Sequence, residues 1–93
     1  QSSIAAKIQE SEVEGVVKGK GSSGLYFRLV DVEEEIKEGD LVVTSHLNEN
    51  IPQGLLLGKI SKVEKRDVEP FQSAYVSPSF SFKNLRTLFV IIQ

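Results

Sequence analysis

Residues 39–64 read GDLVVTSHLNENIPQGLLLGKISKVE, and this stretch decides the fold. It holds two runs rich in β-branched and other apolar residues, 41–44 and 55–63, joined by a polar loop that carries Pro52 and Gly54. β-branched side chains pack well on a pleated sheet, whereas Pro and Gly interrupt regular structure. The stretch therefore predicts two neighbouring strands with a turn-rich loop between them.

Short strand-like runs recur along the whole chain. Eighteen Val and Ile residues against three Ala favour sheet over helix, because β-branched side chains lose rotamer freedom in a helix. The further runs, spaced about 8 to 12 residues apart as in sandwiches and barrels, are residues 4–8, 13–18, 25–30, 71–76 and 88–92. We therefore expect an all-β fold, a small antiparallel barrel of six to seven strands with at most short helical turns, since closure removes unpaired edges.

The composition argues against several classes of function. Eleven Lys and Arg against thirteen Asp and Glu give a net charge of −2, and no run of four basic residues occurs, so nucleic acid is a poor partner. With no Cys and one His, the sequence cannot supply a disulfide, a zinc finger or a thiol nucleophile. We expect no metal and no cofactor.

The length suits a single domain of 93 residues. The longest apolar runs, 55–57 and 88–92, are far shorter than the roughly 20 residues that span a bilayer. The sequence begins with Gln1, shows no signal segment and ends directly after an apolar run. We therefore expect residues 1–93 to be one β-barrel domain excised from a longer protein.

Gly19, Gly21 and Gly24 spell GxGxxG, a pattern that can cradle a dinucleotide pyrophosphate. That mechanism needs the glycines to lead into a helix N-terminus, whose free N–H groups hold the anion. Here they lead into residues 25–30, which have the composition of a strand. The glycines therefore predict a flexible hairpin turn.

Asp40, Ser45 and His46 raise the question of a nucleophilic triad. Adjacent residues in an extended segment point to opposite faces, so the side chains of Ser45 and His46 should diverge. A triad also needs a buried acid to orient its base, and Asp40 lies in a Gly-Asp turn that we expect to face solvent. We expect no catalytic residue and an exposed His46 at a strand end.

The charged residues gather in two places. The carboxylates of residues 33–35, Glu38 and Asp40 lack the ligand spacing of an EF-hand loop, so a solvated acidic turn is expected. Lys59 and Lys62 lie on one predicted strand, and strict alternation would place them on opposite faces. No continuous basic face is then expected.

Large apolar residues also occur in loops, where they have two interpretations. Ile51 lies in the polar loop of residues 47–54, and Phe80 and Phe82 flank a serine after Pro78. Such residues either plug an end of the barrel or contact a partner. We favour the plug, and we keep Ile51, Phe80 and Phe82 as the candidate partner contacts.

Residues 39–64 resemble the C-terminal β region of the MreC family of rod shape-determining proteins, as do FQSAYVSP at 71–78 and NLRTLFVI at 84–91. Residues 10–30 are similar to the stretch that opens the second of the family's two small barrels. Two positions depart from the family pattern: His46 stands where Gly is usual, and Ile51 replaces a Phe. The matching positions are Gly39, Asp40, Thr44, Ser45, Pro52, Gly54, Gly58, Phe71, Gln72, Val76 and Pro78.

These matching residues favour a structural role over a chemical one. Gly39 and Asp40 suit a tight turn into a strand, because Gly allows unusual backbone angles and Asp can bond nearby backbone. Pro52 and Gly54 suit the next corner, where a barrel strand bends. His46 raises the question of a positive φ, which is uncommon for a residue other than Gly.

The resemblance implies a non-catalytic scaffold. It implies a single-pass protein whose β region lies at the extracytoplasmic, periplasmic face of the bacterial cytoplasmic membrane and touches the membrane only through an N-terminal anchor. Partners would be a penicillin-binding transpeptidase, MreD, actin-like MreB and further copies of itself. Two alternatives stay open: a catalytically dead fragment of a trypsin-like barrel, and a small-barrel module that binds peptides or ligands by strand addition.

Overall fold

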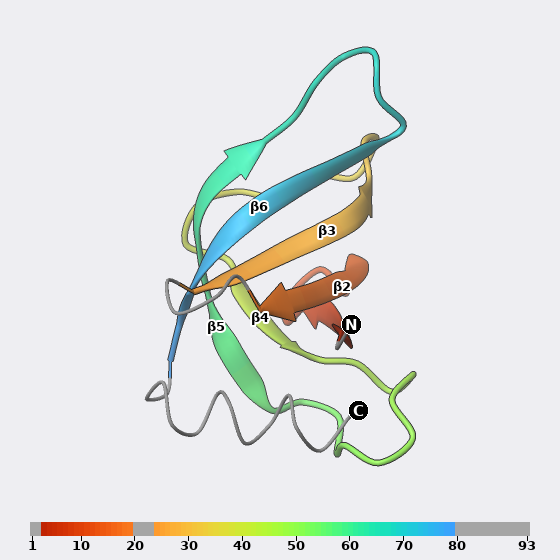
Figure 1. The fold of residues 1–93 in the computed structure, drawn as a ribbon, viewed down its shortest axis with the longest axis vertical. Coiled ribbons are helices and arrows are strands. Elements are labelled where there is room, and N and C mark those ends of the chain that lie inside the picture. The colour runs from red at the N-terminus through yellow and green to blue at the C-terminus, as the bar shows by residue number, and fades with distance from the viewer. Residues whose placement is uncertain (1–2, 20–23, 80–93) are drawn as a thin grey trace.

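The computed structural model describes residues 3–19 and 24–79 (Figure 1). This part of the chain contains strands and turns, without a helix, and so without a helical segment able to cross a bilayer. The predicted strand at 88–92 lies outside the described residues. The described residues form six strands, which are β1 (Ser3–Ile8), β2 (Glu14–Gly19), β3 (Leu25–Asp31), β4 (Leu41–Thr44), β5 (Leu56–Glu64) and β6 (Phe71–Pro78).

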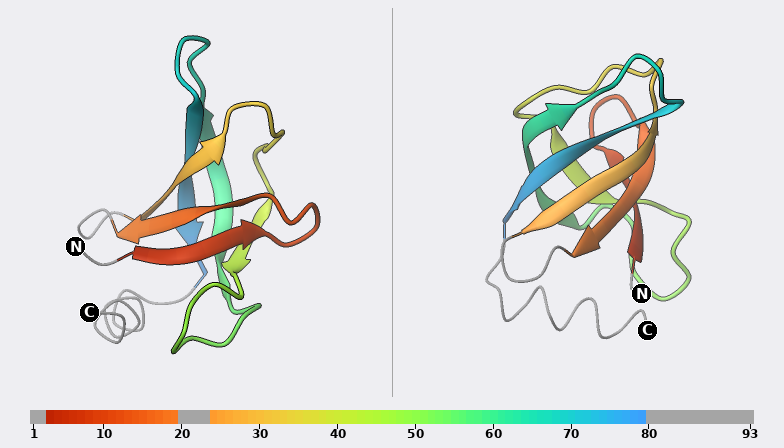
Figure 2. Two further views of the ribbon diagram at one scale, coloured as in Figure 1. Left: turned by 90° about the vertical axis from the view of Figure 1, so that its right-hand side faces the viewer. Right: turned by 45° about the horizontal axis from the view of Figure 1, so that its top comes forward.

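The strands close into a barrel in the order β1-β2-β3-β6-β5-β4, with β4 returning to pair with β1. Every pairing is antiparallel. The two views of Figure 2 show the strands wrapping around one interior. The predicted all-β antiparallel barrel is confirmed. Each described strand pairs with a neighbour on both sides. The described barrel therefore offers no long free strand edge, which a peptide would need in order to bind by strand addition.

The core fills the barrel interior. Along β1, Ile4, Ala6 and Ile8 point inward and are buried, which is the period-2 alternation of a half-buried strand. Phe27 on β3 is the largest fully buried side chain. Ile36, the one apolar residue of the acidic turn, also packs into this cluster. The interior of the described barrel is thus filled by side chains.

The glycine-rich segment joins two paired strands. Gly19 at the end of β2 lies opposite Leu25 at the start of β3, in antiparallel register. Gly24 has a φ of +137°, a conformation that side chains rarely adopt. The hairpin prediction is confirmed; residues 20–23, which include Gly21, lie outside the described residues.

Two β-bulges change which residues face outward. Between Phe27 and Val30 the register of β3 against β6 shifts, and Leu29 there takes a φ of +61° and is exposed. Between Ile60 and Lys62 the register of β5 against β6 also shifts. Lys59 and Lys62 are therefore both exposed outside the barrel, and the expectation of opposite faces is wrong. An extra residue in one strand reverses the alternation beyond it.

Candidate interaction surface

Two of the residues considered for a catalytic triad, Ser45 and Asp40, accept hydrogen bonds from different backbone amides. Ser45 is fully buried, and its Oγ accepts a hydrogen bond from the Leu47 amide at 3.2 Å. The Asp40 carboxylate accepts one from the Lys37 amide at 3.0 Å, whereas His46 is exposed. In residues 3–19 and 24–79 no hydrogen bond joins these three side chains. The arrangement lacks the base–nucleophile contact that a triad requires.

Thr44 organises the corner between β4 and β5. Its buried hydroxyl donates to the Pro52 carbonyl at 2.7 Å and accepts from the Leu55 amide at 2.9 Å. The amide of Gly54 donates to the Thr44 carbonyl at 2.9 Å, and Gly54 has a φ of +86°. The loop is thus folded back onto the last residue of β4, and Gly supplies the left-handed turn that this requires.

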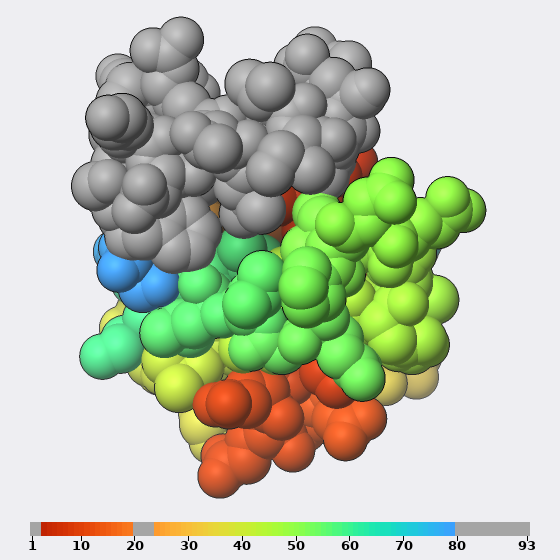
Figure 3. Space-filling view, turned by 90° about the horizontal axis from the view of Figure 1, so that it is seen from below, coloured from red at the N-terminus to blue at the C-terminus, as the bar shows by residue number. Residues whose placement is uncertain are grey.

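Asn48, in the same loop, is a structural residue that the sequence pattern does not predict. Its side-chain Oδ1 accepts from the Ala5 amide at 3.0 Å, and its Nδ2 donates to the Ala5 carbonyl at 2.9 Å and to the Ser45 carbonyl at 3.1 Å. The side-chain amide therefore bonds β1 as a neighbouring strand would. No local pattern distinguishes it from an ordinary loop Asn, because its partner is 43 positions away. Seen from below, this loop and the start of β5 form the green region of Figure 3.

The turn into β4 uses the predicted glycine. Gly39 has a φ of +94°, and its amide donates to the Ile60 carbonyl at 2.9 Å. His46, which stands where the family has Gly, needs no such conformation: among the described non-glycine residues only Glu12 and Leu29 have positive φ. The departure at His46 therefore introduces no backbone strain.

Gln72 ties the acidic turn to the barrel. Its side chain is 4% exposed, and its Nε2 donates to the carbonyls of Asp31 at 3.0 Å and Glu34 at 2.6 Å. The carboxylates at residues 33–35 remain exposed, as expected for a solvated turn. Both N–H groups of the Gln72 side-chain amide thus donate to backbone carbonyls. A carboxylate at this position has no N–H group and could not donate these bonds.

The remaining candidate residues from the sequence differ in how deeply they are buried. Ile51 is 7% exposed and belongs to the core, which agrees with the plug interpretation and leaves a partner little to contact. Val76 is also buried, whereas Pro78 is exposed at the end of β6. Phe80 and Phe82 lie outside the described residues.

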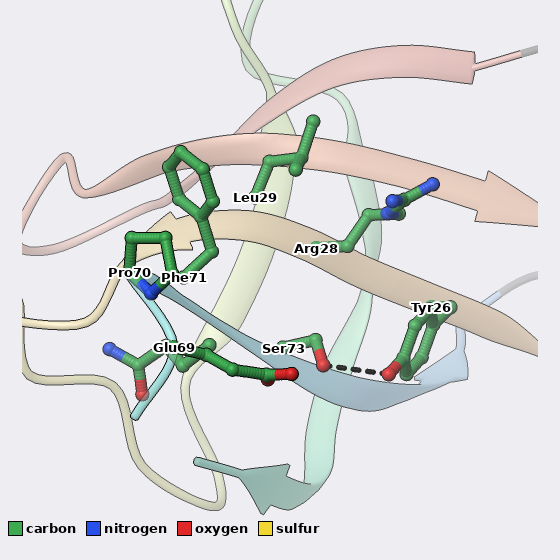
Figure 4. A pocket seen from close by; sticks show the side chains of 8 residues that line it. Tyr26, Arg28, Leu29, Glu69, Pro70, Phe71 and Ser73 are labelled. Carbon is green, nitrogen blue, oxygen red and sulfur yellow. Dashed lines mark hydrogen bonds between the residues drawn. The ribbon is translucent and has the colours of Figure 1, made fainter. Parts of the chain in front are cut away.

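A shallow groove runs over the outside of β3 and β6, beside the first bulge. We call its outward residues Tyr26, Arg28, Leu29, Phe71 and Ser73 the β3–β6 face; Figure 4 shows their side chains. Leu29 is 46% exposed and Phe71 is 48% exposed. The apolar part of this face is therefore available to a partner. The sequence pattern indicated only a fold-making role for Phe71 and did not predict this face.

The far end of the β3–β6 face is aromatic and flanked by cations. The register places Lys18, Tyr26, Tyr75 and Lys62 in one row across four strands. The two tyrosine rings lie 5.2 Å apart between centroids, and the Tyr26 hydroxyl is 2.7 Å from the hydroxyl of Ser73. Cross-strand aromatic pairs stabilise a sheet, so this row has a structural role.

The sequence of the barrel matches a known protein family. Residues 1–92 match the family model described as rod shape-determining protein MreC, barrel core. The chain belongs to the MreC family. The MreC of Listeria monocytogenes is 30% identical over 91 residues, which cover 95% of this chain and 31% of that protein. The MreC of Bacillus subtilis is 25% identical, with 95% and 33% covered. The chain thus spans about a third of its curated MreC relatives.

Solved MreC structures share the barrel. The chain aligns with MreC of Listeria monocytogenes at a TM-score of 0.77 and 30% identity, covering 86% of this chain and 40% of that one. It also aligns with a complex between penicillin-binding protein PBP2 and MreC from Helicobacter pylori, at a TM-score of 0.73 and 25% identity, covering 86% and 50%. The MreC resemblance of residues 39–64 is therefore confirmed in sequence and in fold.

Proposed function

We propose that this barrel is a non-catalytic scaffold domain that organises the peptidoglycan elongation machinery by contacting a penicillin-binding transpeptidase. The observation that carries the proposal is the match of residues 1–92 to the MreC barrel core, together with an MreC relative whose structure is a complex with PBP2. The described residues support it, because the side chains of Asp40, Ser45 and His46 share no hydrogen bond and apolar side chains fill the barrel interior.

The same proposal covers the setting of the domain. The barrel belongs to a longer, membrane-anchored chain and lies on the extracytoplasmic side, where transpeptidases act on peptidoglycan. MreD and MreB-type proteins are further partners, and the full-length protein self-associates. These statements rest on membership of the MreC family.

The test is co-purification of the full-length protein with the penicillin-binding transpeptidase of the same organism. A chain from which residues 1–93 have been deleted serves as the comparison. We expect the full-length protein to retain the transpeptidase and the deleted chain to lose most of it. Equal retention by both chains would show that the barrel is not the contacting part.

Self-association is tested separately, by sedimentation of the full-length protein over a range of concentrations. We expect its mean mass to rise with concentration. A constant monomer mass up to high concentration would remove self-association from the proposed function and leave the transpeptidase contact standing.

A further inference from the structure

The bulge on β3 holds an apolar side chain in an unfavourable position. Leu29 has a φ of +61° and is 46% exposed. A left-handed backbone is costly for a bulky residue, and a half-exposed Leu recovers only part of that cost by burial. Fold stability alone would favour Gly or Asn at this position. Strain that the fold does not need points to a role for the side chain itself.

The strained residue has an apolar neighbour on the adjacent strand. Phe71, which is 48% exposed at the start of β6, lines the same groove as Leu29 (Figure 4). Its register partner on β3 is Asp31, two residues from Leu29. Strict alternation from Phe27 would turn Leu29 into the barrel, and the bulge turns it outward beside Phe71. Two large apolar side chains are thereby brought together on the surface.

The charges around the groove indicate what kind of segment fits it. Within residues 3–19 and 24–79, Arg28 forms no ion pair, although it stands next to Leu29 on the groove wall. Glu69 lies on another wall of the groove. An apolar segment with a carboxylate placed against Arg28, and none against Glu69, is complementary to this arrangement. Arg, Tyr and other aromatic residues are also enriched where binding energy concentrates.

The size of the groove favours a segment of a larger partner over a second copy of the barrel. A half-exposed large apolar side chain offers on the order of 100 Å², so Leu29 and Phe71 together offer roughly 200 Å². A stable interface buries about 800 Å² on each partner. The groove can therefore supply the anchor of a larger contact, but it is too small to hold a dimer of barrels together.

We propose that the β3–β6 face docks an apolar segment of the penicillin-binding transpeptidase, with Leu29 and Phe71 as its anchors and Arg28 facing a carboxylate of that segment. This inference rests on the proposed function. It assigns the contact to the outside of β3 and β6, away from the loop of Ile51.

The test measures the dissociation constant between the full-length protein and the transpeptidase for matched variants. Leu29→Asn removes the anchor while keeping a residue that tolerates positive φ, and Phe71→Ser removes the second anchor. Leu47→Asn is the control, because Leu47 is 60% exposed in the β4–β5 loop. We expect binding at least about tenfold weaker for Leu29→Asn and Phe71→Ser, and a change below about twofold for Leu47→Asn.

Folding is checked by the melting temperature of each variant. Leu29→Asn should melt close to the wild type, so that its loss of binding is not a loss of fold. Arg28→Gln should slow association and reduce its salt dependence, as expected for a charge at the rim of an interface.

The outcomes separate the two proposals. If the wild-type protein fails to bind, the proposed function fails and this inference fails with it. If the wild type binds and both anchor variants bind equally well, or if only Leu47→Asn weakens binding, the docking face is wrong while the scaffold function stands.

Discussion

The substitution Gly58→Ala tests how closely the strands of this barrel must approach. Gly58 pairs with Val42 on one side and Pro78 on the other. A Cβ added at this position would overlap the Ser77 carbonyl oxygen and would lie 2.7 Å from Val76 Cγ1. Real Cβ atoms essentially never come closer than 3.0 Å to another heavy atom. The overlap is with backbone, so β5 and β6 would have to separate to accommodate the methyl group.

The expected loss follows from that geometry. Overpacking typically costs 1–3 kcal/mol, and a clash with backbone lies at the upper end, so we expect about 3 kcal/mol. For a domain of this length the total stability is about 5–14 kcal/mol. Each kcal/mol corresponds to about 4–8 °C in melting temperature, so Gly58→Ala should lower it by about 12–24 °C.

Thermal unfolding followed by circular dichroism measures this effect, with Gly54→Ala as the control. A Cβ added at Gly54 would meet no heavy atom within 4 Å, but the φ there is +86°, so the control carries only backbone strain. That strain is worth about 1–2 kcal/mol. The close-approach argument would be refuted if Gly58→Ala melted within about 2 °C of the wild type, or at a higher temperature than Gly54→Ala.

Three further substitutions test the polar contacts of the fold by thermal unfolding. Thr44→Val keeps the side-chain shape but orphans two backbone groups of the β4–β5 loop, and we expect a loss of about 2–3 kcal/mol; an unchanged melting temperature would show that the hydroxyl is dispensable. Asn48→Ala should cost about 1–2 kcal/mol, because the backbone N–H and C=O of Ala5 lose their hydrogen-bond partner. The control Asn50→Ala, at an exposed position, should stay within about 0.5 kcal/mol, and equal losses for the two variants would contradict the Asn48–Ala5 pairing. Gln72→Leu should cost about 2–3 kcal/mol, because the carbonyls of Asp31 and Glu34 lose their donor, and a neutral result would mean that water replaces the amide.

The strands could be predicted from the sequence because their signal is local. Alternation of apolar and polar residues marks β1, and the Val and Ile excess favours sheet throughout. The turn at Gly39 could also be predicted, since a positive φ there requires Gly.

The candidate surface could not be predicted from the sequence, because it depends on the bulges. Nothing in the composition around Leu29 or Lys62 marks an extra residue, yet each register shift changes which side chains face outward. The role of the loop residue Asn48 was hidden for a related reason, since its bonds to Ala5 join segments 43 positions apart. The sequence thus indicates where the strands are, and the pairing of distant segments decides which residues a partner meets.

Our proposal that the transpeptidase docks on the β3–β6 face has a direct test, because residues 1–93 contain no cysteine. In the full-length protein, Leu29→Cys and Leu47→Cys each introduce one exposed thiol in the barrel, on the β3–β6 face and in the β4–β5 loop. The rate of alkylation at each position, located by mass spectrometry, is measured with and without the transpeptidase. We predict that the transpeptidase slows alkylation of Leu29→Cys several-fold and leaves Leu47→Cys unchanged. Protection of Leu47→Cys alone, or protection of neither position by a transpeptidase that binds, would contradict this assignment.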